Sequence, residues 1–190
     1  MIKIEQESIK SKRCCLMVFD RDGTLIQDDG YVHRVEDLRF LPGVREALEL
    51  ASLHSGSIVI ATNQGGIGLG KYGEAQFRLF SLALLAQLKA WGIEIDCILA
   101  CPHHPSSPKL EMRSCTCRKP GTAMLEEAIS STKTQLNRVA VFGDKQTDVE
   151  MARKVGVAGY LISGNLNSYV ANWIDSHASQ SEVLPKSGLE

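Results

Sequence analysis

The feature that most constrains this chain is a regular alternation of short apolar segments with amphipathic ones. Four apolar segments have the length of buried strands, and each stops abruptly at polar or reactive side chains; they are residues 14–19, 58–61, 95–100 and 139–142. Helical patterns bounded by Gly or Pro accompany them, at residues 44–53, 74–91, 123–129 and 149–155. This alternation predicts an α/β fold: a three-layer, Rossmann-like parallel sheet with helices on both faces and the polar strand ends along one edge.

Size and composition indicate a single domain spanning residues 1–190, with 44% hydrophobic and 23% charged residues. The formal net charge of −1 gives no reason to expect binding to nucleic acid or to a membrane surface, so we expect a small-molecule partner and a monomer. No segment has the length of a membrane span or the character of a signal peptide, which predicts a cytoplasmic protein. We expect residues 1–12 and 176–190 to be mobile and the long connections 28–41 and 101–120 to be functional loops.

Two carboxylates follow the first predicted strand, in the segment FDRDGTL. At the strand tip, Asp20 can attack phosphorus and bind a metal, while Asp22 can protonate a leaving oxygen and later deprotonate water. Gly23 lets the chain turn sharply after them. Surface turns are also rich in Asp, so the pair taken alone does not separate a catalytic site from an ordinary turn.

A second carboxylate pair, Asp144 and Asp148, follows the fourth predicted strand. Oxygen ligands from Asp20, Asp144 and a backbone carbonyl suit Mg²⁺, which would reduce the repulsion between an attacking aspartate and a phosphate. These residues predict a magnesium-dependent phosphoryl-transfer site at the carboxyl ends of the strands.

Phosphate-binding groups complete that set. Thr62 and Asn63, at the tip of the second predicted strand, can hydrogen-bond phosphate oxygens. Arg118 and Lys119 supply the positive charge that a phosphoryl transition state needs.

Three cysteines and a histidine occur together in the loop 101–117 and provide a complete tetrahedral set for Zn²⁺; they are Cys101, His103, Cys115 and Cys117. A site with four protein ligands has no open position, so we expect it to order the loop and to place Arg118 and Lys119, which follow directly. His104 is a rival ligand. The alternative, cysteines that act as small core residues, suits Cys14, Cys15 and Cys97, which lie in or beside apolar strands.

The segment GGIGLGK at residues 65–71 also fits the spacing of a nucleotide-binding P-loop. Tyr72 stands where a P-loop requires Ser or Thr for magnesium, so we interpret the segment as a flexible flap near the substrate.

Taken in order, the segments DRDGT, TNQ, RKP and GDKQTD resemble the four motifs of the haloacid dehalogenase (HAD) superfamily of phosphatases. The resemblance implies a nucleophile, a general acid and base that also binds metal through its backbone carbonyl, two phosphate-holding residues and a magnesium ligand; in that order they are Asp20, Asp22, Thr62 with Lys119, and Asp144. It further implies that Asp148 supports the metal or Lys119 without contacting the substrate.

Within the superfamily, the segments DDGYVH, TNQGGIGLGKY, EAQF and CPHHP resemble a zinc-loop subgroup without a large cap domain, whose members act on heptose bisphosphates or histidinol phosphate. The GYVH segment favours a heptose 1,7-bisphosphate that loses one phosphate, the C7 phosphate by this resemblance. The implied substrate-binding set is Asp28, Asp29, Gly30, Tyr31, Thr62, Asn63, Gln64, Gly65, Arg118, Lys119 and Lys145, with Lys71 as a further candidate.

The chain departs from that subgroup at two places. Residues 121–124 read GTAM where a His-Pro-Gly-Met-like segment is typical, and LISGNLNSY lacks a basic residue usual after the last strand. Three alternatives therefore stay open: a histidinol-phosphate phosphatase, a broader small-metabolite phosphatase, and a non-catalytic module that binds a partner through its zinc loop.

Overall fold

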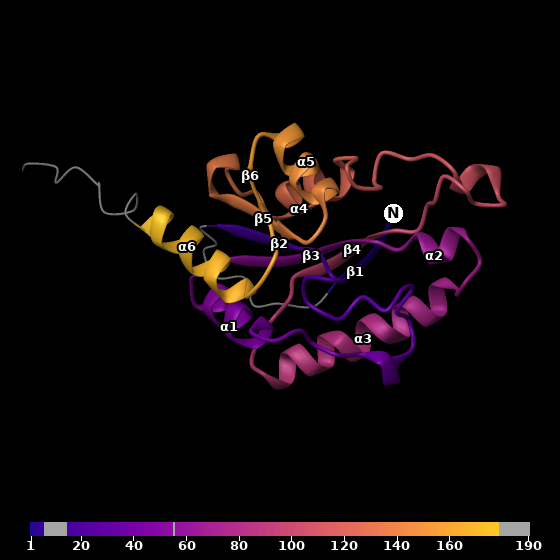
Figure 1. The fold of residues 1–190 in the computed structure, drawn as a ribbon. Helices are drawn as coiled ribbons and strands as arrows, with labels where there is room; N and C mark the ends of the chain where they lie inside the picture. Colours follow the sequence, from indigo (N-terminus) through magenta and orange to yellow (C-terminus); the bar gives the residue numbers. More distant parts are fainter. Residues whose placement is uncertain (6–14, 55, 179–190) are drawn as a thin grey trace, which may run out of the picture.

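The computed structural model describes residues 1–5, 15–54 and 56–178 as an α/β fold (Figure 1). Its strands are β1 (Ile2–Glu5), β2 (Leu16–Phe19), β3 (Ser57–Asn63), β4 (Cys97–Cys101), β5 (Val139–Gly143) and β6 (Ala158–Leu161). Its α-helices are α1 (Val44–His54), α2 (Gly65–Gly68), α3 (Glu74–Ala90), α4 (Ala123–Thr132), α5 (Gln146–Val155) and α6 (Leu166–Ala178). Short 3₁₀ turns lie at Val35–Asp37, Leu110–Met112 and Leu136–Arg138.

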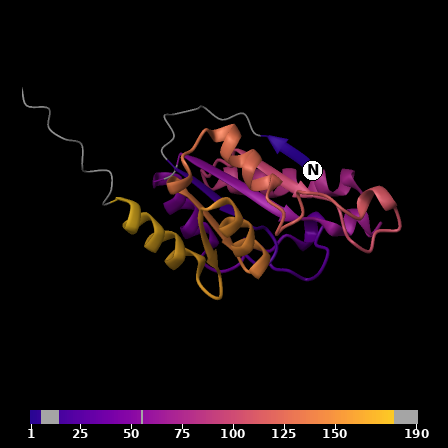
Figure 2. The ribbon, with the colours of Figure 1, turned by 90° about the horizontal axis from the view of Figure 1, so that it is seen from above.

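All the strands form one sheet in the order β1-β4-β3-β2-β5-β6. Strands β2 to β6 are parallel to their neighbours, and β1 alone pairs antiparallel, at the β4 edge. In the view from above, β1 and β6 lie at opposite edges of the sheet (Figure 2). The order places β2 between β3 and β5, so the residues that follow these strands meet at the centre of the carboxyl edge.

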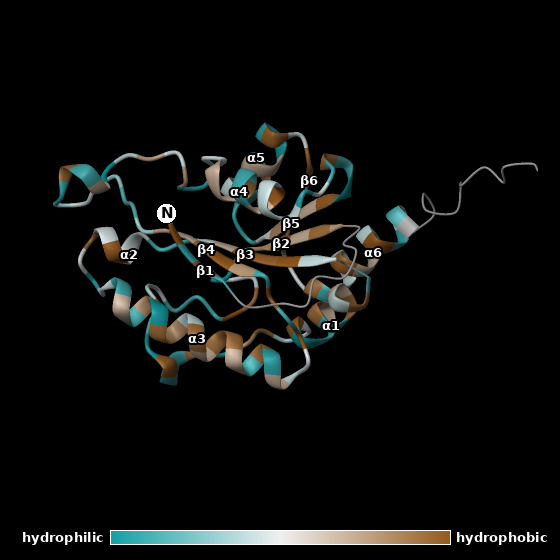
Figure 3. Ribbon diagram, turned by 180° about the vertical axis from the view of Figure 1, so that it is seen from behind, coloured by the Kyte–Doolittle hydropathy of each residue, from teal (hydrophilic) through white to brown (hydrophobic). Residues whose placement is uncertain are grey.

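The helices cover both faces of the sheet, with α4 and α5 on one face and α1, α3 and α6 on the other (Figure 1). Successive residues of β2 alternate between two apolar clusters: Met17 and Phe19 pack toward α1 and α3, and Leu16 and Val18 toward α4 and α5. Colouring by hydropathy shows apolar strands between helices whose outer faces are polar (Figure 3). The predicted α/β fold and its three layers are confirmed.

Four elements of the fold were not predicted from the sequence. Residues 2–5, predicted to be mobile, form β1, where Ile2 and Ile4 are buried and Lys3 pairs with Glu127 of α4 at 2.7 Å. An antiparallel edge strand therefore corrects the expectation of a wholly parallel sheet. The others are β6, α2 and α6; the last runs to Ala178 and so includes part of the segment predicted to be mobile. Cys14 and the rest of the two segments expected to be mobile, at 6–12 and 179–190, lie outside the described residues.

The segment 65–71 is a short helix with its turn, packed against the loop that holds the cysteines. Gly68 accepts a hydrogen bond from the Ser107 hydroxyl at 2.5 Å and donates its N–H to the Pro102 carbonyl at 2.9 Å. A side chain at Gly68 would collide with that same carbonyl oxygen, so the close approach requires glycine here. In the described part of the chain, no helix combines the length and apolar character needed to cross a membrane.

Candidate active site

The carboxyl ends of β2, β3 and β5 place the predicted acidic and hydroxyl side chains together. Asp20 follows β2 directly, Thr62 lies at the end of β3, and Asp144 follows β5. The Asp20 N–H donates to the Phe142 carbonyl at 2.8 Å, which extends the β2 and β5 pairing up to the site. Asp20 and Thr62 are buried, at 5% and 1% exposure.

Lys119 lies between two of these carboxylates. Its Nζ is 2.5 Å from Asp20 Oδ1 and 2.5 Å from Asp148 Oδ1, and it donates to the Ala61 carbonyl at 2.9 Å. Burial raises the pKa of Asp20 to about 6, and the charge of Lys119 opposes this rise by favouring the carboxylate. The negative charge of Asp148 adds to the rise in the pKa of Asp20, and the two carboxylates share Lys119.

A cation fits beside Asp20. Oxygen atoms of Asp20, Asp144 and Asp148 all lie within 4.8 Å of one another. Burial, and then the charge of Asp20, raise the pKa of Asp144, so these facing carboxylates favour a positive charge between them. Gly23, at φ +84°, brings the chain so close to Asp144 that a Cβ there would collide with its carboxylate. Oxygen ligands of this kind are those that Mg²⁺ prefers.

Asn63 fixes the backbone of Lys119 from both sides. Its Nδ2 donates to the Lys119 carbonyl at 3.1 Å, and its Oδ1 accepts the Lys119 N–H at 3.0 Å. Its amide thus positions the lysine as well as lining the neighbouring cavity.

The predicted zinc ligands converge in space. Cys101 Sγ lies 3.5 Å from Cys115 Sγ and 3.6 Å from His103 Nδ1, and Cys117 Sγ lies 3.5 Å from the same nitrogen. The cysteines are free thiols. Bonds of about 2.0 to 2.3 Å to a central Zn²⁺ place tetrahedral ligand atoms at about this separation, so the cluster fits the ion. Burial raises the pKa of Cys101 and of Cys117, and a bound cation would hold both as thiolates.

The cysteine cluster is joined to Arg118 through two contacts. The Arg118 N–H donates to Cys115 Sγ at 3.3 Å, and its Nη1 donates to the His103 carbonyl at 3.0 Å. The loop that carries the cluster therefore orients the Arg118 guanidinium.

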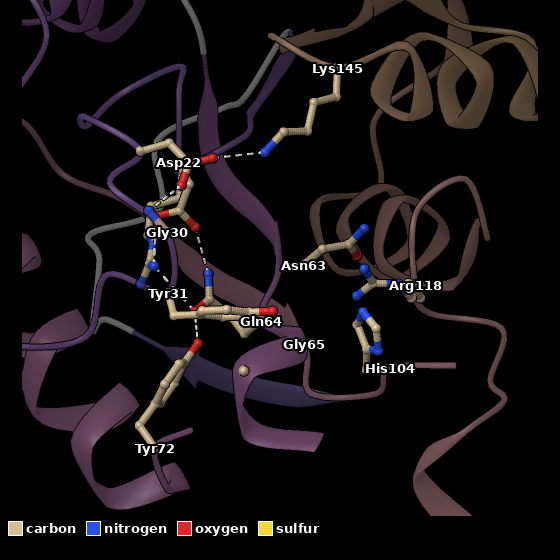
Figure 4. Close-up of a pocket in the computed structure, with 13 residues that line it drawn as sticks. Asp22, Gly30, Tyr31, Asn63, Gln64, Gly65, Tyr72, His104, Arg118 and Lys145 are labelled. Atoms are coloured by element: carbon tan, nitrogen blue, oxygen red, sulfur yellow. Dashed lines mark hydrogen bonds and ion pairs between the residues drawn. The ribbon is translucent and has the colours of Figure 1, made fainter. Parts of the chain in front are cut away.

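A polar cavity of about 240 Å³ opens beside Asp22 (Figure 4). Figure 4 shows Arg118 and His104 facing Asp22, Tyr31 and Gln64 across it, with Lys145 reaching in from above. Lys145 Nζ forms an ion pair with Asp28 at 3.0 Å. Of the predicted substrate-binding residues, those that line the cavity are Asp28, Gly30, Tyr31, Asn63, Gln64, Gly65, Arg118 and Lys145.

Other predicted residues lie elsewhere. Asp29 and Lys71 are exposed and do not line the cavity. Thr62 and Lys119 are buried and do not line it either, and Lys119 contacts Asp20 instead. Four cavity residues outside the predicted site residues are Arg21, Gly66, Tyr72 and His104. The sequence carried little signal for Arg21, because a charged residue between two catalytic aspartates is expected to face solvent, whereas it is 1% exposed.

Comparison by sequence shows that the chain is related to known phosphatases. A HAD-hydrolase-like family model matches residues 116–172. The chain is 36% identical over 139 residues to the D-glycero-beta-D-manno-heptose-1,7-bisphosphate 7-phosphatase of Haemophilus ducreyi, which covers 73% of this chain and 76% of the relative. It is 37% identical over 134 residues to the Escherichia coli K12 enzyme of the same name, covering 70% of each.

Solved structures give the same grouping. A HAD-like phosphatase structure from Mesorhizobium loti matches with a TM-score of 0.83 and 24% identity over 92% of each chain, which shows the common fold. The D,D-heptose 1,7-bisphosphate phosphatase of B. bronchiseptica, complexed with magnesium and phosphate, matches with a TM-score of 0.70 and 29% identity. That match covers 83% of this chain and 86% of the other.

Proposed function

This chain belongs to the heptose-1,7-bisphosphate 7-phosphatase family of HAD-like hydrolases, and on that premise we propose that it removes the C7 phosphate of D-glycero-D-manno-heptose 1,7-bisphosphate. It is a phosphatase, a hydrolase of phosphoric monoesters. The observation that carries the proposal is the pairing of buried Asp20 with Lys119 at 2.5 Å, two residues before Asp22, which lines a polar cavity.

The reaction has two steps in this proposal. First, an Asp20 carboxylate oxygen attacks phosphorus, the bond from phosphorus to the C7 oxygen breaks, and Asp22 gives its proton to that oxygen. Next, Asp22 removes a proton from water as the water oxygen attacks the phosphorus held on Asp20. The bond from phosphorus to Asp20 breaks, which releases inorganic phosphate and restores both side chains.

Positive charge is needed at both steps. Lys119 would hold a phosphate oxygen while keeping Asp20 ionised, and the Thr62 hydroxyl would donate to another oxygen. Mg²⁺ held by the Asp20 and Asp144 carboxylates and the Asp22 backbone carbonyl would supply the charge that screens phosphate from the nucleophile. Asp148 supports this set by pairing with Lys119 at 2.5 Å.

The cysteine cluster is part of the proposal as a structural zinc site. Zn²⁺ held by the three thiolates and His103 would leave no position open for substrate. Burial lowers the pKa of His103, which favours the neutral imidazole that a metal binds. Because Arg118 contacts the backbone of His103 and the sulfur of Cys115, the ion would fix the place of the guanidinium.

The second phosphate of the substrate would serve as a binding handle. Lys145 and Arg118 supply positive charge at the cavity, and Gly30 and Tyr31, which also line it, would bind sugar hydroxyls. Binding energy from the spare phosphate can position the reacting end in line with Asp20. We expect the enzyme to act on this small sugar as a cytoplasmic monomer.

A substrate panel tests the proposal. We expect kcat/KM for heptose 1,7-bisphosphate to exceed that for histidinol phosphate and for an aryl phosphate by at least about tenfold, equivalent to about 1.4 kcal/mol of transition-state stabilisation. The matched control is Asp20→Asn, which keeps the shape of the side chain but removes the nucleophile and should lose more than about a thousandfold in rate.

Each alternative has its own result on the same panel. Preference for histidinol phosphate by about tenfold would identify the other branch of the subgroup, and equal rates on all esters would identify a broad phosphatase. Absence of magnesium-dependent hydrolysis in zinc-loaded protein would favour the non-catalytic module and overturn the proposal.

A further inference from the structure

Both oxygens of the Asp22 carboxylate accept hydrogen bonds from side chains that have no role in the proposed reaction steps. Arg21 donates to Oδ1 through Nε at 3.0 Å and through Nη2 at 2.7 Å, and Gln64 Nε2 donates to Oδ2 at 2.8 Å. Tyr72 donates its hydroxyl to Gln64 Oε1 at 2.5 Å (Figure 4). We propose that Arg21, Gln64 and Tyr72 form a positioning cradle that fixes the Asp22 carboxyl group for proton transfer, an inference that rests on the proposed function.

The orientation of the Gln64 amide follows from its neighbours. Its Oε1 receives two donors, the Tyr72 hydroxyl and Arg21 Nη2 at 3.1 Å, and a guanidinium has no acceptor. The amide nitrogen must therefore face Asp22 and the Thr62 hydroxyl, to which it donates at 2.8 Å. By donating to Gln64 Oε1, Tyr72 and Arg21 orient the amide so that its nitrogen donates to the Asp22 carboxylate.

The burial of Arg21 is the strongest sign of a specific role. Its side chain is 1% exposed and stacks over the Phe80 ring at 4.7 Å, and its Nη1 has no hydrogen-bond partner among the described residues. A buried guanidinium is costly unless it is paired, and Asp22 is the carboxylate it contacts. An apolar residue would pack against Phe80 without that cost, so the arginine is explained by what it does to Asp22.

Tyr72 connects this cradle to the 28–41 loop, which contains the GYVH segment. Its ring stacks on His33 of the GYVH segment, with centroids 4.6 Å apart and planes 6° from parallel. Burial raises the pKa of Tyr72 to about 12, so the phenol keeps the proton that it donates to Gln64. A side chain at Gly66 would overlap the Tyr72 ring, so the glycine allows the ring to reach its place.

The dependence on the leaving group separates a positioning role from a merely structural one. An alkyl alkoxide such as the C7 oxygen needs a proton as it leaves, whereas nitrophenolate leaves without one. A misplaced Asp22 should therefore slow phosphoryl transfer from the sugar but not from the nitrophenyl ester. A general loss of structure would slow both to the same extent.

The test uses Tyr72→Phe, which removes one hydroxyl and keeps the ring, and Arg21→Lys, which keeps the charge but loses the two-point contact. The matched control is Tyr169→Phe on α6, which removes a hydroxyl that contacts Ser163 outside the cavity. Rapid-quench measurement gives the rate of phosphoenzyme formation on zinc- and magnesium-loaded protein, with heptose bisphosphate and with 4-nitrophenyl phosphate.

We expect Tyr72→Phe to slow phosphoenzyme formation from heptose bisphosphate by about tenfold or more and from the nitrophenyl ester by less than about twofold, with a larger effect in Arg21→Lys. Equal slowing with both substrates, or none in Tyr72→Phe, overturns the cradle even if Arg21→Lys fails to fold. If instead the wild-type protein forms no phosphoenzyme from either ester, the proposed function fails and the cradle with it.

Discussion

Removing the positive charge of Lys119 should destabilise the fold as well as stop the reaction. Lys119 is 4% exposed, and its Nζ lies 2.5 Å from a carboxylate oxygen on each of Asp20 and Asp148. Lys119→Met keeps the unbranched stem and removes the charge. Two buried carboxylates would then face each other with ligand atoms within 4.8 Å and no cation between them.

The size of the effect follows from that separation. Two unit charges about 4.8 Å apart repel by about 3.5 kcal/mol at an effective dielectric constant of about 20. Relative to the ionised carboxyl group of the unfolded chain, protonating one of them at pH 7 to escape the repulsion costs about as much, since the roughly three pKa units between its ordinary pKa and pH 7 correspond to about 4 kcal/mol. We therefore expect Lys119→Met to lower the free energy of unfolding by about 3 to 4 kcal/mol, within the usual range for breaking a buried ion pair.

A second substitution isolates the repulsion. Asp148→Asn in the Lys119→Met background leaves one buried carboxylate and should restore about 3 kcal/mol, while activity stays lost because no lysine holds the phosphate. The measurement is urea unfolding at pH 7 in magnesium-free buffer with bound zinc retained, alongside steady-state hydrolysis with magnesium. If the double variant were no more stable than Lys119→Met, the explanation that Lys119 offsets repulsion between Asp20 and Asp148 would be wrong.

Two further predictions concern the metals. Cys115→Ser should reduce bound zinc from about one per chain, measured by elemental analysis, and lower activity that added magnesium does not restore, while Cys97→Ala, which removes a buried thiol outside the cluster, should retain zinc. Because Asp20 must be ionised to attack and its pKa is raised to about 6, kcat/KM should fall as the pH drops through that value at low magnesium. Rising magnesium favours the carboxylate and should move this acidic limb to lower pH; a limb that does not move would contradict metal binding by Asp20.

The central strands were predictable because each is a short apolar segment buried on both faces. Strands β2 to β5 lie under helices on either side, so almost every residue in them is apolar and their ends are marked by a sudden change to polar groups. That contrast is a property of local sequence. It also located Asp20 and Asp144, because they are the first charged residues after two of the apolar segments.

The edge elements were harder because their burial depends on partners far away in the sequence. In β1, Ile2 and Ile4 alternate with Lys3, but four residues are too few to separate a strand from a polar terminus until β4 is beside them. Helix α6 did carry a helical pattern, with buried Leu166, Val170 and Trp173 facing α1. The Ser-rich residues that follow it lack this helical periodicity, and their composition predicted a mobile segment from residue 176 onward.

The sequence predicted which residues form the site, but not the contacts that they make with one another. The motifs predicted which carboxylates, hydroxyl and lysine would gather: Asp20 and Asp144 follow strands, Thr62 lies at the end of one, and Lys119 belongs to the RKP motif. Nothing local indicated that Asn63 would hold Lys119 by both backbone polar groups, or that Tyr72 would reach Asp22 through Gln64. Such contacts join residues that are distant in sequence, and they exist only once the sheet order is fixed.

The two long loops both contribute to the wall of the cavity beside Asp22. Residues from the 28–41 loop and from the 101–120 loop line the same cavity, with Asp28 and Tyr31 from the first and Arg118 from the second. The second loop is held at one end by the cysteine cluster and at the other by the two hydrogen bonds from Asn63 to the Lys119 backbone. Because Arg118 lies between these two points, its guanidinium is fixed before substrate arrives, and less entropy is lost when phosphate binds. The contacts that orient Arg118 thus provide preorganised positive charge at the cavity, and zinc bound to the cysteine cluster would strengthen them.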